Sequence, residues 1–147
     1  MSDNLQRTLA PHPLERSLVM VGALGCLVIT IIVWDSVSAN QPMWPLPALY
    51  LIEVVALSGL AVIAFLRGGR AGSFTLWAVV GILLAFSILG ALSVGSLYFP
   101  TTLLFAVPAI SYDLRNKQSI GAHLGTCILA AIAQAALMLA VIGLLRG

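Results

Sequence analysis

The chain has 147 residues, of which 61% are hydrophobic and only 8% are charged, and its mean hydropathy is +1.08. A soluble domain averages about 25% charged residues, so this composition excludes a water-exposed globular fold. The net charge of +2 comes without the basic cluster that binding to nucleic acid requires.

A membrane-spanning helix needs about 20 apolar residues, which leaves no room here for a soluble catalytic domain. We therefore predict an all-α polytopic membrane bundle of five short spans. Residues 1–16 are polar and predict a cytoplasmic tail, and residues 17–147 form a single transmembrane domain. The first span is expected at 17–37, with Asp35 at its outer boundary.

Three prolines and no charge mark residues 36–47 as an outer loop, because proline ends a preceding helix. The second span is expected at 47–66. A short, basic, glycine-rich turn at 67–72 then leads into the third span.

Residues 74–112 contain no charged residue. A single helix of this length would extend about 58 Å at 1.5 Å per residue, nearly twice the apolar thickness of a bilayer. The chain must therefore turn inside this interval, and Ser93-Val94-Gly95-Ser96 is the best turn. The third span is then expected at 74–92 and the fourth at 96–112. A polar loop at 113–117 precedes the last span, at 119–145.

The positive-inside rule favours five spans over four. With the N-terminus inside, five spans place six basic residues inside and only Arg146 outside. An alternative with four spans plus a re-entrant segment moves Arg115 and Lys117 outside and Arg146 inside. The expected location is a bacterial-type plasma membrane, with a cytoplasmic N-terminus. We expect the first span to be retained, with cleavage after Val37-Ser38-Ala39 as the rival.

Glu53 is an acid within the second span. An ionisable residue inside a membrane is costly and suggests a functional site. Gln134 lies in the outer half of the last span, at a depth similar to that of Glu53. We predict that Glu53 and Gln134 form a candidate proton or ligand site. A protonated, purely structural Glu53 is the alternative.

Small residues in the last span predict helix packing. Gly121 and Gly125 form a G-x-x-x-G pattern, and Ala130 lies on a stripe with His123, Cys127 and Gln134, at spacings of about one helical turn. Small residues let helix backbones approach closely in lipid. We assign Gly121, Gly125 and Ala130 to packing. The aromatic residues predict interfacial belts, formed by Trp34, Trp44, Tyr50 and Tyr98 outside and by Phe74, Trp77 and Tyr112 inside.

No catalytic, phosphate-binding or dinucleotide-binding motif is present, so we predict no catalytic residues, no metal site and no cofactor. A haem held by His12 and His123 has no supporting motif. The expected function is that of a non-enzymatic accessory or assembly protein. Its expected partners are the lipid bilayer and either a second copy or another membrane protein, without nucleic acid. The alternative is a small proton-coupled transporter that uses Glu53.

Overall fold

The computed structural model describes residues 11–39, 46–90 and 95–146, and these residues contain helices and turns but no strand. The elements are α2 (Pro13–Ser38), α3 (Leu46–Arg67), α4 (Gly69–Leu89), the short 3₁₀ helix η1 (Gly95–Tyr98), α5 (Phe99–Arg115) and α6 (Ile120–Arg146). Five helical segments are long and apolar enough to cross a membrane, with η1 and α5 together forming the fourth. The predicted all-α bundle of five helices is therefore confirmed.

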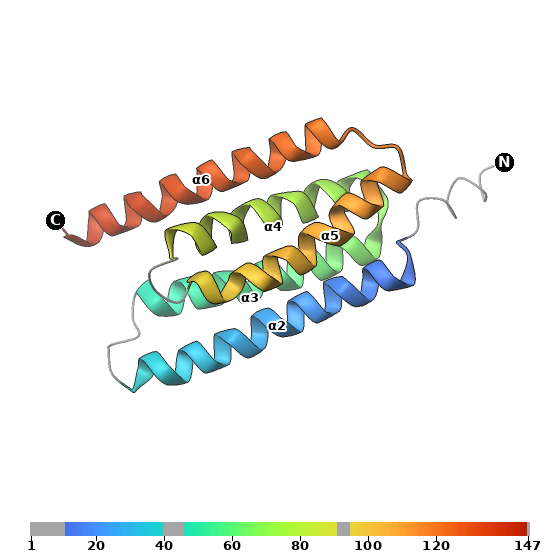
Figure 1. The fold of residues 1–147 in the computed structure, drawn as a ribbon. Helices are drawn as coiled ribbons and strands as arrows, with labels where there is room; N and C mark the ends of the chain where they lie inside the picture. The colour runs from blue at the N-terminus through green and yellow to red at the C-terminus, as the bar shows by residue number, and fades with distance from the viewer. Residues whose placement is uncertain (1–10, 40–45, 91–94, 147) are drawn as a thin grey trace.

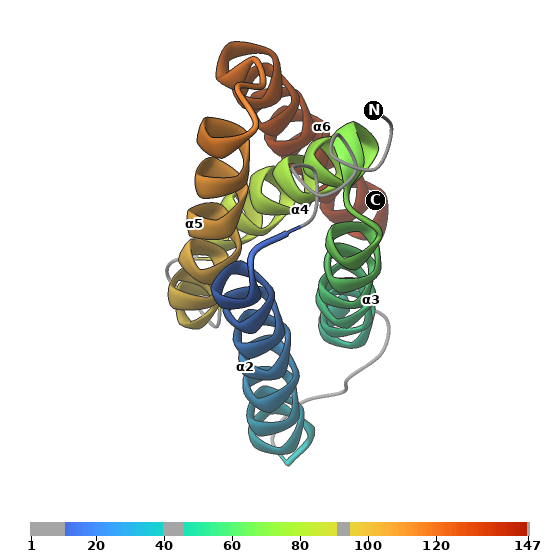
Figure 2. The ribbon, with the colours of Figure 1, turned by 90° about the vertical axis from the view of Figure 1, so that its right-hand side faces the viewer.

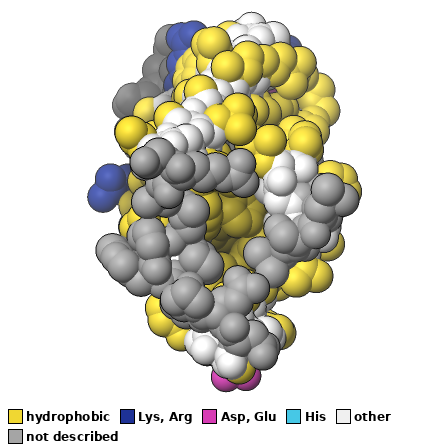
Figure 3. Space-filling view, turned by 90° about the vertical axis from the view of Figure 1, so that its left-hand side faces the viewer, with side chains coloured by type: hydrophobic (Ala, Val, Ile, Leu, Met, Phe, Trp, Pro, Cys, Tyr) yellow, Lys and Arg dark blue, Asp and Glu magenta, His cyan; other side chains and the backbone are white. Residues whose placement is uncertain are grey.

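The five helices run alternately up and down, so α2 begins at one end of the bundle and α6 ends at the other (Figure 1). This topology places Arg16, Arg67, Arg70, Arg115 and Lys117 at one end, which we call the basic end. The described side chains at the other end are mostly hydrophobic (Figure 3).

Helix α4 is the centre of the bundle. It packs against α3, α5 and α6, while α2 packs against α3 and α5. Viewed along the bundle, the other helices surround α4 (Figure 2). Within the most apolar window of each helix, 61% of the residues are buried in α4 but only 17% in α6. Helix α6 therefore exposes most of its surface on the flank of the bundle.

Local chemistry sets the start of α2. Pro13 occupies its first turn, where a missing N–H costs nothing. Glu15 and His12 form a reciprocal capping box, in which the His12 N–H donates to Glu15 Oε2 at 2.7 Å and the Leu14 N–H donates to His12 Nδ1 at 3.3 Å. The helix thus begins before residue 17, and residues 13–16 of the predicted tail are its first turn. Residues 1–10 lie outside the described residues.

The predicted basic turn at 67–72 is shorter than expected. Only Gly68 separates α3 from α4, and both Gly68 and Gly69 have positive φ angles, which glycine adopts without steric cost. A Cβ atom on Gly72 would lie 2.5 Å from the Ala64 carbonyl oxygen. Gly72 is therefore a contact between two closely packed helices rather than part of a loop.

The charge-free interval turns where the sequence requires it. Helix α4 ends at Leu89, three residues before the predicted end, and the chain resumes at Gly95. The Gly95 N–H donates to the Gly90 carbonyl at 2.9 Å, and a Cβ atom on Gly95 would lie 2.5 Å from the Gly90 Cα. Residues 91–94, which include part of the predicted turn, lie outside the described residues.

The prediction that the aromatic residues form interfacial belts is wrong for three of them. Trp77, Tyr98 and Tyr112 are buried in the core rather than exposed at an interface. Each has a polar partner inside the bundle: Trp77 donates to Asp113, Tyr98 pairs with Thr30, and the Tyr112 hydroxyl accepts from the Gly69 N–H. Trp34 remains exposed, as an interfacial residue would be.

Candidate functional site

Glu53 and Gln134 are neighbours in the folded chain. Glu53 is half-buried on α3, and Gln134 is 7% exposed on α6. The Gln134 amide lies within reach of the Glu53 carboxyl, yet among the described residues Gln134 Nε2 has no hydrogen-bond partner of standard geometry. The two side chains are therefore close enough to interact.

Tyr50 contributes a third polar group to this site. It precedes Glu53 by about one turn of α3, and its ring packs edge-on against Phe86 of α4, with ring centroids 5.8 Å apart. Its hydroxyl oxygen is buried, and no hydrogen-bond partner for it is present among the described residues. A buried polar group without a partner costs about 1–3 kcal/mol. The structure has two such groups in these side chains, Tyr50 Oη and Gln134 Nε2.

A second polar cluster lies at the basic end, and its centre is Asp113. This residue is in the last turn of α5 and is fully buried. Ser73 Oγ donates to Asp113 Oδ1 at 2.6 Å, and Trp77 Nε1 donates to Oδ2 at 2.7 Å. His123 Nδ1 lies 2.5 Å from the same Oδ2 atom. We call Ser73, Trp77, Asp113 and His123 the Asp113 cluster.

The Asp113 cluster joins three helices through one carboxyl group, because Ser73 and Trp77 come from α4, Asp113 from α5 and His123 from α6. A buried carboxylate is tolerated only when it is paired and hydrogen-bonded. Three partners meet that condition here. The Phe74 ring also packs edge-on against the His123 ring, with centroids 4.2 Å apart.

Serine, histidine and aspartate are the residue types of a hydrolase triad, but the geometry of this cluster is different. In a triad, the serine and the acid contact opposite nitrogens of the imidazole ring. Here Asp113 and Ser73 both approach His123 Nδ1, the latter at 3.5 Å, and the Ser73 hydroxyl donates to the carboxyl group. The imidazole is therefore not placed to activate this serine by the triad mechanism.

The sequence analysis placed Asp113 in a polar loop, and this assignment was wrong. Helix α5 continues to Arg115, so Asp113 faces the core within its last turn. One signal was present in the sequence. Only residues 116–119 connect α5 to α6, and so short a connection requires the end of one helix to lie beside the start of the next. An acid three residues before this connection and a histidine four residues after it could have been paired on that ground.

An ion pair closes the basic end. Arg115 Nη1 and Nη2 donate to Glu15 Oε1 and Oε2 at 2.9 and 3.0 Å, and Glu15 is buried. This bidentate geometry is the strong form of an arginine–carboxylate pair. Because the same Glu15 caps α2, the pair ties the start of α2 to the end of α5.

The residues assigned to helix packing lie away from the contacts within the chain. A Cβ atom on Gly121 or Gly125 would meet no described atom of the chain within 4 Å, and Ala130 is half-buried. The close approach of α6 instead depends on Gly81 of α4, where an added Cβ atom would overlap the Cys127 carbonyl oxygen. A packing role for Gly121 and Gly125 therefore remains a prediction about another molecule.

The two histidines have separate roles, since His12 caps α2 and His123 belongs to the Asp113 cluster. Within residues 11–39, 46–90 and 95–146, no group of three potential metal ligands is present. Comparisons with protein-family models, with curated proteins and with solved structures found no match to this chain.

Proposed function

We propose that this protein is a non-enzymatic accessory or assembly subunit, which binds another membrane protein through the exposed side of α6. The observation that carries the proposal is the placement of its helical glycines. Gly121, Gly125 and Gly143 all lie on α6, and none has a described atom within 4 Å of an added Cβ. A glycine inside a helix costs roughly 0.5–1 kcal/mol relative to alanine.

Two glycines of α4 serve close contacts within the fold. Gly72 allows α3 and α4 to approach, and Gly81 allows α4 and α6 to approach. The glycines of α6 have no such role inside the chain. Small residues on a membrane helix allow a second backbone to come close, and contact with another protein would explain why they are there.

These glycines share one side of the helix. At 3.6 residues per turn, Gly121, Gly125, Ala136 and Gly143 lie within about 60° of arc. The exposed side chains of Ile132 and Leu139 lie within the same arc, so the small residues alternate with larger ones along it. We call the four small residues the α6 small-residue face. It points away from the buried side, which holds His123, Cys127, Gln134 and Met138. The face is therefore free to receive a partner helix while α6 stays packed on α4.

The proposed setting is a bacterial-type plasma membrane with the N-terminus in the cytoplasm. Five apolar helices support the membrane location. The positive-inside rule supports a cytoplasmic position for the basic end. That end collects five basic residues, which are Arg16, Arg67, Arg70, Arg115 and Lys117.

The test is the mass of the complex that is extracted from the membrane in mild detergent. We expect a complex heavier than one chain, containing either a second copy or a stoichiometric partner. Replacing Gly125 with leucine should dissociate it. Gly59→Leu is the matched control, because Gly59 is also a helical glycine with no described atom within 4 Å. A single chain in both wild type and control, or a complex that survives Gly125→Leu, would contradict the proposal.

A second candidate function is supported by the Glu53 site. A small proton-coupled transporter needs an acid inside the membrane that exchanges a proton. The specific observation in its favour is that Glu53 lies within reach of Gln134, whose buried Nε2 atom lacks a partner among the described residues. The buried hydroxyl of Tyr50, on the same helix as Glu53, also lacks one.

A further inference from the structure

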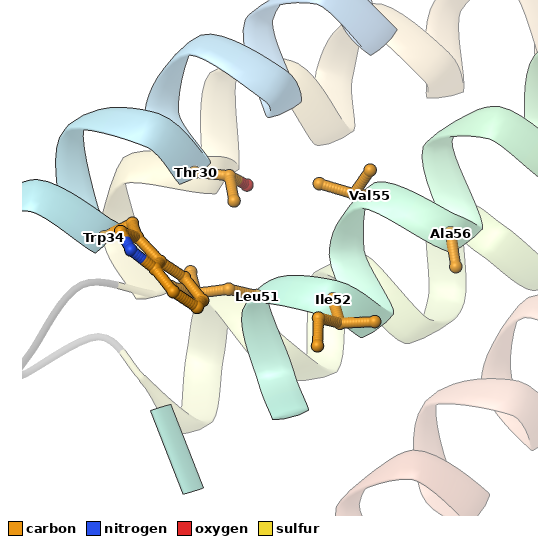
Figure 4. Close-up of a pocket in the computed structure, with 6 residues that line it drawn as sticks. All are labelled: Thr30, Trp34, Leu51, Ile52, Val55 and Ala56. Carbon is orange, nitrogen blue, oxygen red and sulfur yellow. The ribbon is translucent and has the colours of Figure 1, made fainter. Parts of the chain in front are cut away.

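A groove runs between α2 and α3, toward the end of the bundle opposite the basic end. Its volume is 290 Å³, and it is lined by Thr30, Trp34, Leu51, Ile52, Val55 and Ala56. Figure 4 shows Thr30 and Trp34 on α2 at one side of the groove, and the other four residues on α3 at the opposite side. The groove is independent of α6 and of Glu53.

The lining of the groove is almost wholly apolar. The Thr30 hydroxyl does not serve it, because that group is bonded to the Tyr98 hydroxyl at 3.0 Å inside the bundle. An apolar cavity of about 150 Å³ stays dry and binds small apolar molecules. A space of 290 Å³ with this lining is therefore a site for hydrocarbon and not for water.

The length of the groove suits a segment of hydrocarbon chain. From Leu51 to Ala56 the groove extends about 7.5 Å along α3. A single hydrocarbon tail, whose carbons pack about 4 Å from their neighbours, can enter a space of 290 Å³.

The environment of the groove supplies such a tail. Ile52 and Trp34 are 57% and 45% exposed at its rim, and both belong to helices apolar enough to span a membrane. Trp34 also carries an indole N–H at the end where an interfacial tryptophan meets lipid head groups. The next residue, Asp35, is exposed at the same end of α2, and its negative charge disfavours an anionic head group or a fatty-acid carboxylate.

We propose that the groove between α2 and α3 holds one acyl chain of a zwitterionic phospholipid, with the head group at the Trp34 end. The chain fills the space beside Val55 and Ala56. Trp34 packs against its upper part and turns its N–H toward the head-group region.

The first test measures the lipid retained by the purified protein, by native mass spectrometry after extraction into detergent. Wild type should retain one phospholipid per chain, and phosphatidylcholine should be preferred over an anionic phospholipid. Ala56→Phe fills the groove and should lower the occupancy about tenfold, equivalent to about 1.4 kcal/mol. Leu60→Phe, an exposed position one turn further along α3, is the matched control and should retain the lipid.

The second test needs no groove-filling variant. Wild type and Trp34→Phe are reconstituted in anionic vesicles that contain increasing amounts of phosphatidylcholine brominated on its acyl chains, and the difference in fluorescence isolates Trp34. Quenching of Trp34 should saturate at a low fraction of the brominated lipid. Quenching that only follows the bulk lipid fraction, wild type that retains no lipid, equal retention by Ala56→Phe, or a preference for the anionic lipid would each overturn the proposal.

Discussion

Asp113 and His123 form a buried pair across the short connection between α5 and α6, with Asp113 Oδ2 2.5 Å from His123 Nδ1. Their exposed fractions are 0% and 1%. Because Asp113 also accepts hydrogen bonds from Ser73 and Trp77 of α4, this pair connects the central helix to the last two helices.

Replacing Asp113 should destabilise the whole bundle. Asp113→Ala leaves three buried donors without their acceptor and should lower the free energy of unfolding by about 3–5 kcal/mol. Asp113→Asn keeps one acceptor oxygen and should lose less. Asp35→Ala is the control, because Asp35 is exposed, and it should change stability by less than about 0.5 kcal/mol. The measurement is thermal unfolding in detergent, and equal midpoints for Asp113→Ala and the control would contradict a structural role.

Gly81 should be the least tolerant glycine of α4. A methyl group there would overlap the Cys127 carbonyl oxygen of α6, so Gly81→Ala must push the two helices apart. Overpacking of this kind costs about 1–3 kcal/mol. The opposite result is expected for Gly59→Ala on α3, where the added methyl meets open space and helix propensity favours alanine by up to about 1 kcal/mol. The same unfolding assay compares them, and a stabilised Gly81→Ala protein would show that the α4–α6 contact is looser than described.

Glu53→Gln separates the two candidate functions. A glutamine keeps the size of the side chain but cannot exchange a proton, so an assembly subunit should keep its fold and its complex. A proton-coupled transporter should instead lose all proton uptake in vesicles under an imposed pH gradient, as read by a trapped pH-sensitive dye. Asp35→Asn removes an acid outside the site and should leave that uptake intact. Wild-type vesicles that take up no more protons than empty ones would exclude this type of transport by Glu53.

The two ends of the chain should lie on opposite sides of the membrane. Five helices that alternate in direction place the start of α2 and the end of α6 at opposite ends of the bundle (Figure 1). A reporter that is active only in the cytoplasm should therefore work when it is fused before Met1 and be silent when it is fused after Gly147. Activity at both ends would require an even number of crossings.

The number of helices followed from the sequence because it depends on local quantities. Long apolar segments and the length of a helix relative to a bilayer predict where the chain must turn, and the charge-free interval 74–112 does turn near its middle. The approximate helix ends were also predictable from prolines and charged residues. Capping was less visible, since Glu15 acts both as a cap and as the partner of Arg115.

The direction in which each side chain faces was decided only by the tertiary structure. Trp77 and Tyr112 are of the residue types that are common at membrane interfaces. The rotation of α4 and α5 nevertheless points both side chains into the core, where they contact Asp113 and Gly69 respectively. The similar depth of Glu53 and Gln134 in the membrane made their proximity plausible. Only the rotation of α3 and α6 about their own axes decides whether the two side chains face each other. Hydropathy is a property of each residue, so the sequence of a segment is enough to predict whether that segment enters the membrane. Contacts between polar groups depend on how packed helices are rotated relative to one another. That rotation cannot be predicted from the sequence of one segment alone.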